Sequence, residues 1–98
     1  MEIIKNRDGA KLELTLSGRL DTASSPQLEE VITGSLDGVA ELVLDFKELQ
    51  YVSSAGLRVL LGAQKAMNRQ GKMKLCNVSE GIKDVFDITG FSDILTII

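Results

Sequence analysis

The segment 41–46 constrains the fold most, because its centre, Leu42-Val43-Leu44, is apolar without alternation. A strand with one wet face alternates apolar and polar residues, whereas a strand covered on both faces reads as a continuous apolar run and commonly has parallel neighbours. We therefore expect this segment at the centre of a sheet, covered on both faces. Together with the helical segments on either side of it, such a strand predicts an α/β fold.

Two further strands are predicted before this segment. The Asp8-Gly9 pair is a hairpin signal between strand-like stretches at 2–5 and 10–17. In the second stretch every other residue is a leucine, so one face is predicted to be buried and the other to face water. We expect Gly18 to end this strand.

Apolar residues at helical spacing predict three helices, at 25–36, 57–67 and 79–90. One serine of the Ser24-Ser25 pair is the expected N-cap of the first helix and Ser79 that of the third, and Gly90 is the expected left-handed residue after the third. Strands are predicted at 72–78 and 94–98. We therefore expect a single domain over residues 1–98, with a mixed sheet of four to five strands and helices packed largely on one face.

Composition disfavours several classes of function. The net charge is −3 and the basic residues are scattered, which argues against a nucleic-acid partner. The chain has no histidine and one cysteine, Cys76, so we expect no metal site, disulfide or cofactor, and we place Cys76 in the core. The lack of catalytic constellations argues against an enzyme. With no signal-like amino terminus and no apolar run of about 20 residues, we expect a cytosolic protein without membrane insertion.

The junction after the 41–46 strand carries a recognisable pattern. Residues 45–57 read D-F-x-x-L-x-Y-V-S-S-A-G-L, which resembles the core motif of the STAS domains, the bacterial anti-sigma factor antagonists. Gly18-Arg19-Leu20-Asp21 resembles an upstream turn of this family, and residues 85–91 resemble its late helix and turn. The resemblance covers nearly the whole chain and implies a STAS fold.

Two serines stand at the start of the second helix in this motif. The resemblance implies that Ser54 is the residue a partner kinase phosphorylates. The local pattern alone favours an N-cap at Ser54, and both roles are compatible because a cap hydroxyl lies at the surface. Ser53 occupies the position where the best-known members have an aspartate. It is therefore a second candidate acceptor, although a cap or turn role is favoured for it.

The resemblance also indicates a partner-binding surface, formed by Asp21 of the upstream turn and by residues at the start of the second helix: Ser53, Ser54, Ala55, Gly56, Leu57 and Arg58. We expect Gly56 to give a partner close access to the helix and Gly62 to serve internal packing. Arg58 and Lys65 are expected on the solvent side, where they could meet an acidic partner or belong to an ordinary solvated face.

The leading hypothesis is an anti-sigma factor antagonist. The resemblance implies that its unphosphorylated form binds an anti-sigma factor that is also a serine kinase of the histidine-kinase-like ATPase type, and that a metal-dependent serine phosphatase restores that form. An alternative is a STAS docking subunit of a transport or signalling complex whose serines are never phosphorylated. A third hypothesis, nucleotide binding, would require saturable binding of ATP or GTP. An exposed edge strand leaves both a monomer and a weak dimer open.

Overall fold

The computed structural model describes all 98 residues. Its elements are β1 (Glu2–Asp8), β2 (Lys11–Leu20), α1 (Ser25–Ser35), β3 (Glu41–Val52), α2 (Ser54–Asn68), β4 (Lys72–Cys76), α3 (Glu80–Thr89) and a short 3-10 helix, η1 (Phe91–Asp93). None of the helices combines the length and the apolar composition that crossing a bilayer requires.

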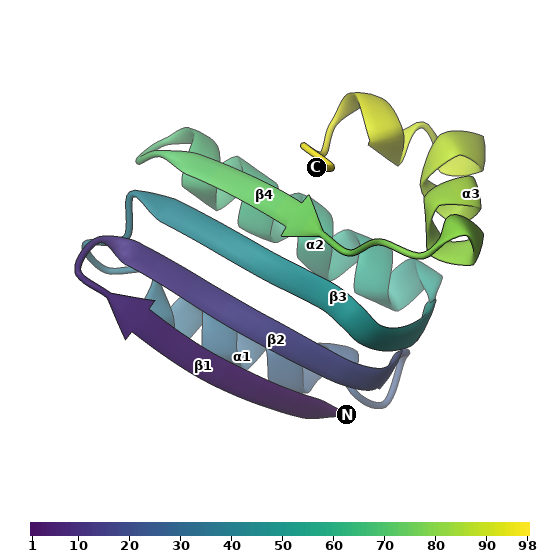
Figure 1. The fold of residues 1–98 in the computed structure, drawn as a ribbon, viewed down its shortest axis with the longest axis horizontal. Coiled ribbons are helices and arrows are strands. Elements are labelled where there is room, and N and C mark those ends of the chain that lie inside the picture. The colour runs from purple at the N-terminus through teal and green to yellow at the C-terminus, as the bar shows by residue number, and fades with distance from the viewer.

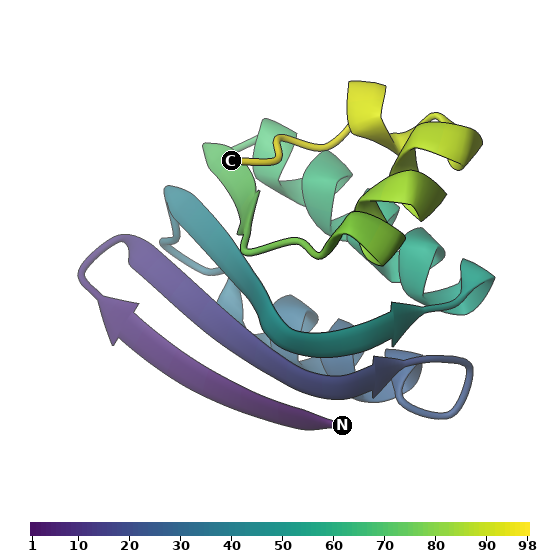
Figure 2. The same cartoon turned by 45° about the vertical axis from the view of Figure 1, so that its right-hand side comes forward.

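The four strands form one mixed sheet in the order β1-β2-β3-β4. β1 is antiparallel to β2, whereas β2, β3 and β4 are parallel to one another. Helices α1 and α2 lie behind the sheet, α3 lies beyond the end of β4, and the front of the sheet carries no helix (Figure 1; Figure 2). The predicted α/β class and the placement of helices largely on one face are confirmed.

The core lies between the sheet and the two helices behind it. Alternate residues of the two inner strands are fully buried there: Leu12, Leu14, Leu16, Leu42, Leu44 and Phe46. Val43 points the other way and is not part of this core, yet it is only 7% exposed. The prediction that its strand is covered on both faces was wrong. Val43 instead sits between its register partners Glu13 and Lys74, whose aliphatic stems can shield it on the open face.

The two inner strands are longer than the sequence predicts. Gly18 does not end β2, which continues to Leu20, and β3 continues to Val52. Gly18 has φ +93 and lies next to a register shift in the β2–β3 pairing, where a residue without a Cβ accommodates the irregular backbone. This extension pairs Leu20 with Val52 and carries the strand ends to the start of α2.

The segment 94–98 does not form the predicted fifth strand. It makes one isolated bridge, Leu75 to Ile97, supported by hydrogen bonds from Leu75 N–H to Thr96 O at 2.8 Å and from Ile98 N–H to Leu75 O at 2.9 Å. β4 has only five residues, and η1 turns the chain immediately before this segment, which leaves room for one bridge.

The predicted helix caps differ in outcome. Ser79 caps α3 by accepting from the Ile82 N–H at 3.3 Å, and Gly90 ends the helix with φ +82, as expected. Ser24 occupies the N-cap position of α1, but its hydroxyl does not cap the helix. The hydroxyl donates to Arg19 O at 2.6 Å instead, so it fastens the β2–α1 turn.

Candidate functional site at the β3–α2 junction

Ser53 is the residue that caps α2. Its backbone is extended, with φ −89 and ψ 175, and its Oγ accepts from the Gly56 N–H at 3.2 Å. Its own N–H donates to Leu20 O at 2.8 Å. The cap role expected for Ser53 is confirmed, and the alternative in which Ser54 is the cap is wrong, because β3 ends at Val52 and the helix begins one residue after Ser53.

Ser54 is the first residue of α2 and is exposed. Its hydroxyl forms no hydrogen bond within the chain, since the cap is supplied by Ser53. Backbone N–H groups of a first helical turn have no intrahelical partner, and the helix dipole favours negative charge there. An added phosphate at Ser54 would therefore be accessible and electrostatically tolerated.

Gly56 and Leu57 are buried rather than available to a partner. A Cβ added at Gly56 would lie 2.7 Å from Leu20 Cγ and 3.0 Å from Leu20 O. The expectation that Gly56 gives a partner access was therefore wrong: its missing side chain lets α2 approach the end of β2. Both residues position the serines from below.

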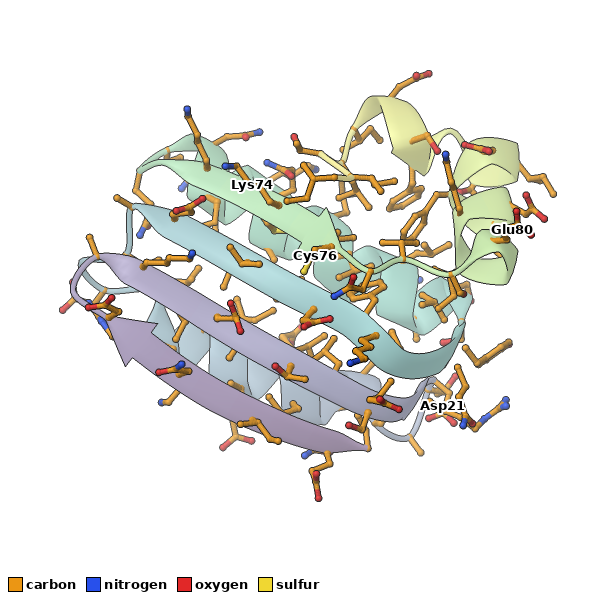
Figure 3. All side chains as sticks on the ribbon, viewed as in Figure 1. Asp21, Lys74, Cys76 and Glu80 are labelled. Carbon is orange, nitrogen blue, oxygen red and sulfur yellow. The ribbon has the colours of Figure 1, made fainter.

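Asp21 is a turn-forming residue at the end of β2, where Figure 3 places it. Its Oδ1 accepts from the N–H groups of Ala23 and Ser24, both at 3.1 Å. The bond from the Ser24 N–H is the main cause that holds the pKa of the Asp21 carboxyl below its ordinary value. Asp21 thus stabilises the turn that precedes α1. This turn directly follows Leu20, whose carbonyl oxygen accepts the Ser53 N–H.

Arg19 and Tyr51 form a contact that the sequence analysis missed. They are register partners on β2 and β3, and the Arg19 guanidinium lies 4.2 Å from the centre of the Tyr51 ring. Arg19 Nε also lies 3.7 Å from Asp21 Oδ2. Tyr51 is 41% exposed, so the junction presents an aromatic surface as well as the serines. Neither residue alone signals this contact, because it depends on the register after a bulge.

The remaining predicted site residues lie on α2. Ala55 is partly exposed, and Arg58 and Lys65 are exposed, as expected for its solvent side. The structure therefore brings Asp21, Ser53, Ser54, Ala55 and Arg58 to the surface around the junction. No group of three or more Cys, Asp or Glu side chains is arranged to hold a metal ion.

The family is decided by the match of the chain to known sequences. The model of the STAS domain matches residues 3–98. The chain belongs to the STAS domain family. An anti-sigma-B factor antagonist of Bacillus subtilis is 36% identical to it over 87 residues, which cover 88% of this chain and 80% of the relative.

Solved structures share the fold of this STAS domain at low sequence identity. SpoIIAA of Bacillus in its phosphorylated form superimposes with a TM-score of 0.77 at 20% identity, covering 99% of this chain and 91% of the other. An anti-sigma factor antagonist from Mycobacterium paratuberculosis superimposes with a TM-score of 0.88 at 18% identity, covering 98% and 83%. These likenesses establish the fold.

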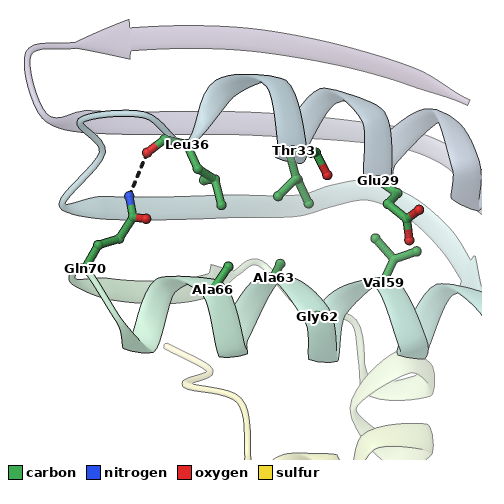
Figure 4. A pocket seen from close by; sticks show the side chains of 9 residues that line it. Glu29, Thr33, Leu36, Val59, Gly62, Ala63, Ala66 and Gln70 are labelled. Atoms are coloured by element: carbon green, nitrogen blue, oxygen red, sulfur yellow. Dashed lines mark hydrogen bonds between the residues drawn. The ribbon is translucent and has the colours of Figure 1, made fainter.

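A groove of about 400 Å³ separates α1 from α2 in this STAS domain (Figure 4). Its α2 wall is low because it is built from Gly62, Ala63 and Ala66. A Cβ added at Gly62 would meet no atom within 4 Å, so the expected packing role of Gly62 was wrong. The groove is closed at one end by Gln70, whose side-chain amide donates to Leu36 O at 2.6 Å.

Cys76 lies on the open face of the sheet, not in the core (Figure 3). Its register partner is Asp45, and its side chain is partly exposed at the end of β4. Burial, followed by the charges of Asp45 and Glu13, raises the pKa of the thiol above its ordinary value. The prediction that Cys76 lies in the core was wrong because side chains alternate along a strand: Met73 and Leu75 take the core side, so Cys76 faces the other way.

Proposed function

We propose that this STAS domain is an anti-sigma factor antagonist that acts in the cytoplasm. Its unphosphorylated form binds an anti-sigma factor that is also a serine kinase, and this binding releases the sigma factor. Phosphorylation of Ser54 ends the binding. The names of its relatives support the role of anti-sigma factor antagonist. The observation that carries phosphorylation at Ser54 is its exposed hydroxyl, which has no hydrogen-bond partner and belongs to the first residue of α2.

The switch acts at the contact surface rather than through the fold. A phosphate adds a charge of about −1.5 to −2. The dipole at the start of a helix stabilises negative charge by roughly 0.3–1 kcal/mol. The domain therefore keeps its structure. A partner packed on neutral Ser54 would instead have to bury a strongly hydrated dianion without a counter-charge, which disfavours the complex.

The partner surface consists of the exposed residues Ser54 and Arg58 together with the partly exposed residues Asp21, Ser53 and Ala55 around the junction. Gly56 and Leu57 hold this surface in place from below, because they pack on β2 and the core. The chain itself is proposed to have no enzymatic activity. The kinase, of the histidine-kinase-like ATPase type, and a metal-dependent serine phosphatase are its partners.

Phosphate transfer is tested by incubating the purified protein with ATP and lysate of its source cells, followed by intact-mass and peptide mass spectrometry. One phosphate on Ser54 is expected, and it should vanish in Ser54→Ala but persist in Ser53→Ala. A phosphate on Ser53 alone would contradict the assignment. No phosphate, in a lysate that phosphorylates a known substrate, would favour the alternative of a STAS docking subunit.

Partner binding is tested with the anti-sigma factor kinase identified by that phosphorylation, measured by titration calorimetry. Ser54→Ala should bind as the wild type does, since it keeps a small neutral side chain. Ser54→Asp should lose most of the affinity, because it places a charge at the contact. Equal binding by both variants would overturn the switch.

A further inference from the structure

The outer edge of β1 is the open edge of the sheet. Nothing lies beyond β1 in either view of the fold, whereas the opposite edge strand, β4, is bridged at Leu75 by the carboxy-terminal segment (Figure 1; Figure 2). β1 pairs with β2 over seven consecutive residues without a register shift, and it contains no proline. A long regular edge with unpaired N–H and C=O groups is a template for another strand.

We infer that this edge binds a second copy of the chain, with the two β1 strands antiparallel about a two-fold axis at Ile4. The result is a continuous eight-stranded sheet. Residues that face each other in an antiparallel pair point to the same side of the sheet. In two identical strands such residues are an even number of positions apart, so the two-fold axis must pass through a residue and not between two residues. Ile4 pairs with Thr15 on the open face and is 55% exposed, so the axis would bring two exposed isoleucines together.

The charges on β1 favour the register centred on Ile4 over the register centred on Lys5. Centred on Ile4, the pairing sets Glu2 opposite Asn6 and Ile3 opposite Lys5 of the second copy, without like charges face to face. Centred on Lys5, it would set Lys5 against Lys5 and Glu2 against Asp8 twice. Like charges directly opposite each other destabilise a strand pair.

On the helix side of the same edge, an acidic residue is available to pair with Lys5 of the second copy. A hollow of about 540 Å³ runs between β1 and α1, with Ile3, Lys5, Glu30 and Val31 among its lining residues. Lys5 bonds the Ser35 hydroxyl of its own chain at 3.3 Å, while Glu30 has no ion pair. The Ile4-centred register places Lys5 of the second copy opposite Ile3, at this hollow, where Glu30 is the available counter-charge.

Association is tested by sedimentation equilibrium from about 10 µM to about 1 mM, the range in which a weak interface of this kind dissociates. The mass should rise from 10.6 kDa toward twice that value. Ile4→Glu, which places two carboxylates at the axis, should stay monomeric, with an unchanged circular dichroism spectrum because Ile4 is exposed.

The register is tested by disulfide trapping in a Cys76→Ser background. Ile4→Cys should form a covalent dimer on mild oxidation, because residue 4 faces itself across the axis, whereas the neighbouring Lys5→Cys should not. A wild-type protein that stays monomeric to about 1 mM would overturn the proposal. Trapping of Lys5→Cys at least as fast as that of Ile4→Cys would overturn it as well.

Discussion

The carbonyl oxygen of Leu20 accepts the N–H of Ser53 at 2.8 Å, and the same residue fills the space that a side chain on Gly56 would need. Leu20 therefore fixes both the cap of α2 and the distance of α2 from the end of β2. Because Leu20 is fully buried, this anchor cannot shift without disturbing the core. The position of Ser54 at the surface depends on it.

Gly56→Ala should destabilise the domain. The added methyl group would lie 2.7 Å from Leu20 Cγ, and overpacking of this kind costs about 1–3 kcal/mol, more than the gain in helix propensity. The free energy of unfolding, measured by urea denaturation, checks the prediction. An unchanged midpoint would mean that α2 can move away from β2 without cost.

Gly62→Ala is the matched change on the same helix and should have the opposite sign. Its methyl group meets no atom within 4 Å, so only the helix propensity changes, by up to about 1 kcal/mol in favour of alanine. The urea midpoint should rise. A lower midpoint would show that the α1–α2 groove is narrower in solution than in this structure.

The two glycines also show where prediction from sequence stops. Both stand in the same apolar helix pattern, from which partner access was predicted for Gly56 and packing for Gly62. In the structure Gly56 packs against Leu20, whereas a Cβ at Gly62 would meet open space. The local pattern gives a helix and its approximate phase. Which side of the helix meets a neighbouring strand depends on how far β2 and β3 extend, and both strands run past their predicted ends.

The strongest local signals were the most reliable. The alternation in β2, the hairpin at Gly9 and the caps at Ser79 and Gly90 are decided by nearby residues, and they were predicted correctly. The placement of helices on one face was also predicted correctly, but the expectation that the 41–46 strand is covered on both faces was wrong. A continuous apolar run does not reveal that long polar neighbours, rather than helices, can shield Val43. Of the candidate site, the serines and Asp21 were proposed from the family resemblance, whereas the contact between the Arg19 guanidinium and the Tyr51 ring depends on the strand register.

Ser53→Ala should destabilise the domain through loss of its cap. Removal of a serine N-cap leaves a helix N–H without a partner and costs about 1 kcal/mol. Ser53→Asp should retain most of the stability, because a carboxylate accepts the same Gly56 N–H. Ser54→Ala serves as the control and should change the free energy of unfolding little, since its hydroxyl has no partner. A larger loss in Ser54→Ala than in Ser53→Ala would contradict the assigned cap.

The Asp21 carboxyl should titrate below its ordinary pKa of 3.8, because the ionised form accepts the N–H bonds of the turn, that of Ser24 foremost. A carboxyl whose pKa is lowered by folding stabilises the folded state above its unfolded pKa, and this contribution is lost as the pH falls through the lower folded value. The wild type should therefore lose more stability than Asp21→Asn when the pH is lowered from about 5 to about 2. Carbon NMR titration of the carboxyl gives the pKa directly.

Ser24→Ala should raise the pKa only in part. It removes the Ser24 hydroxyl, whose one proton is shared between Arg19 O and Asp21 Oδ1, and it leaves the backbone N–H in place. A wild-type pKa at or above 3.8 would show that the turn does not favour the ionised carboxylate.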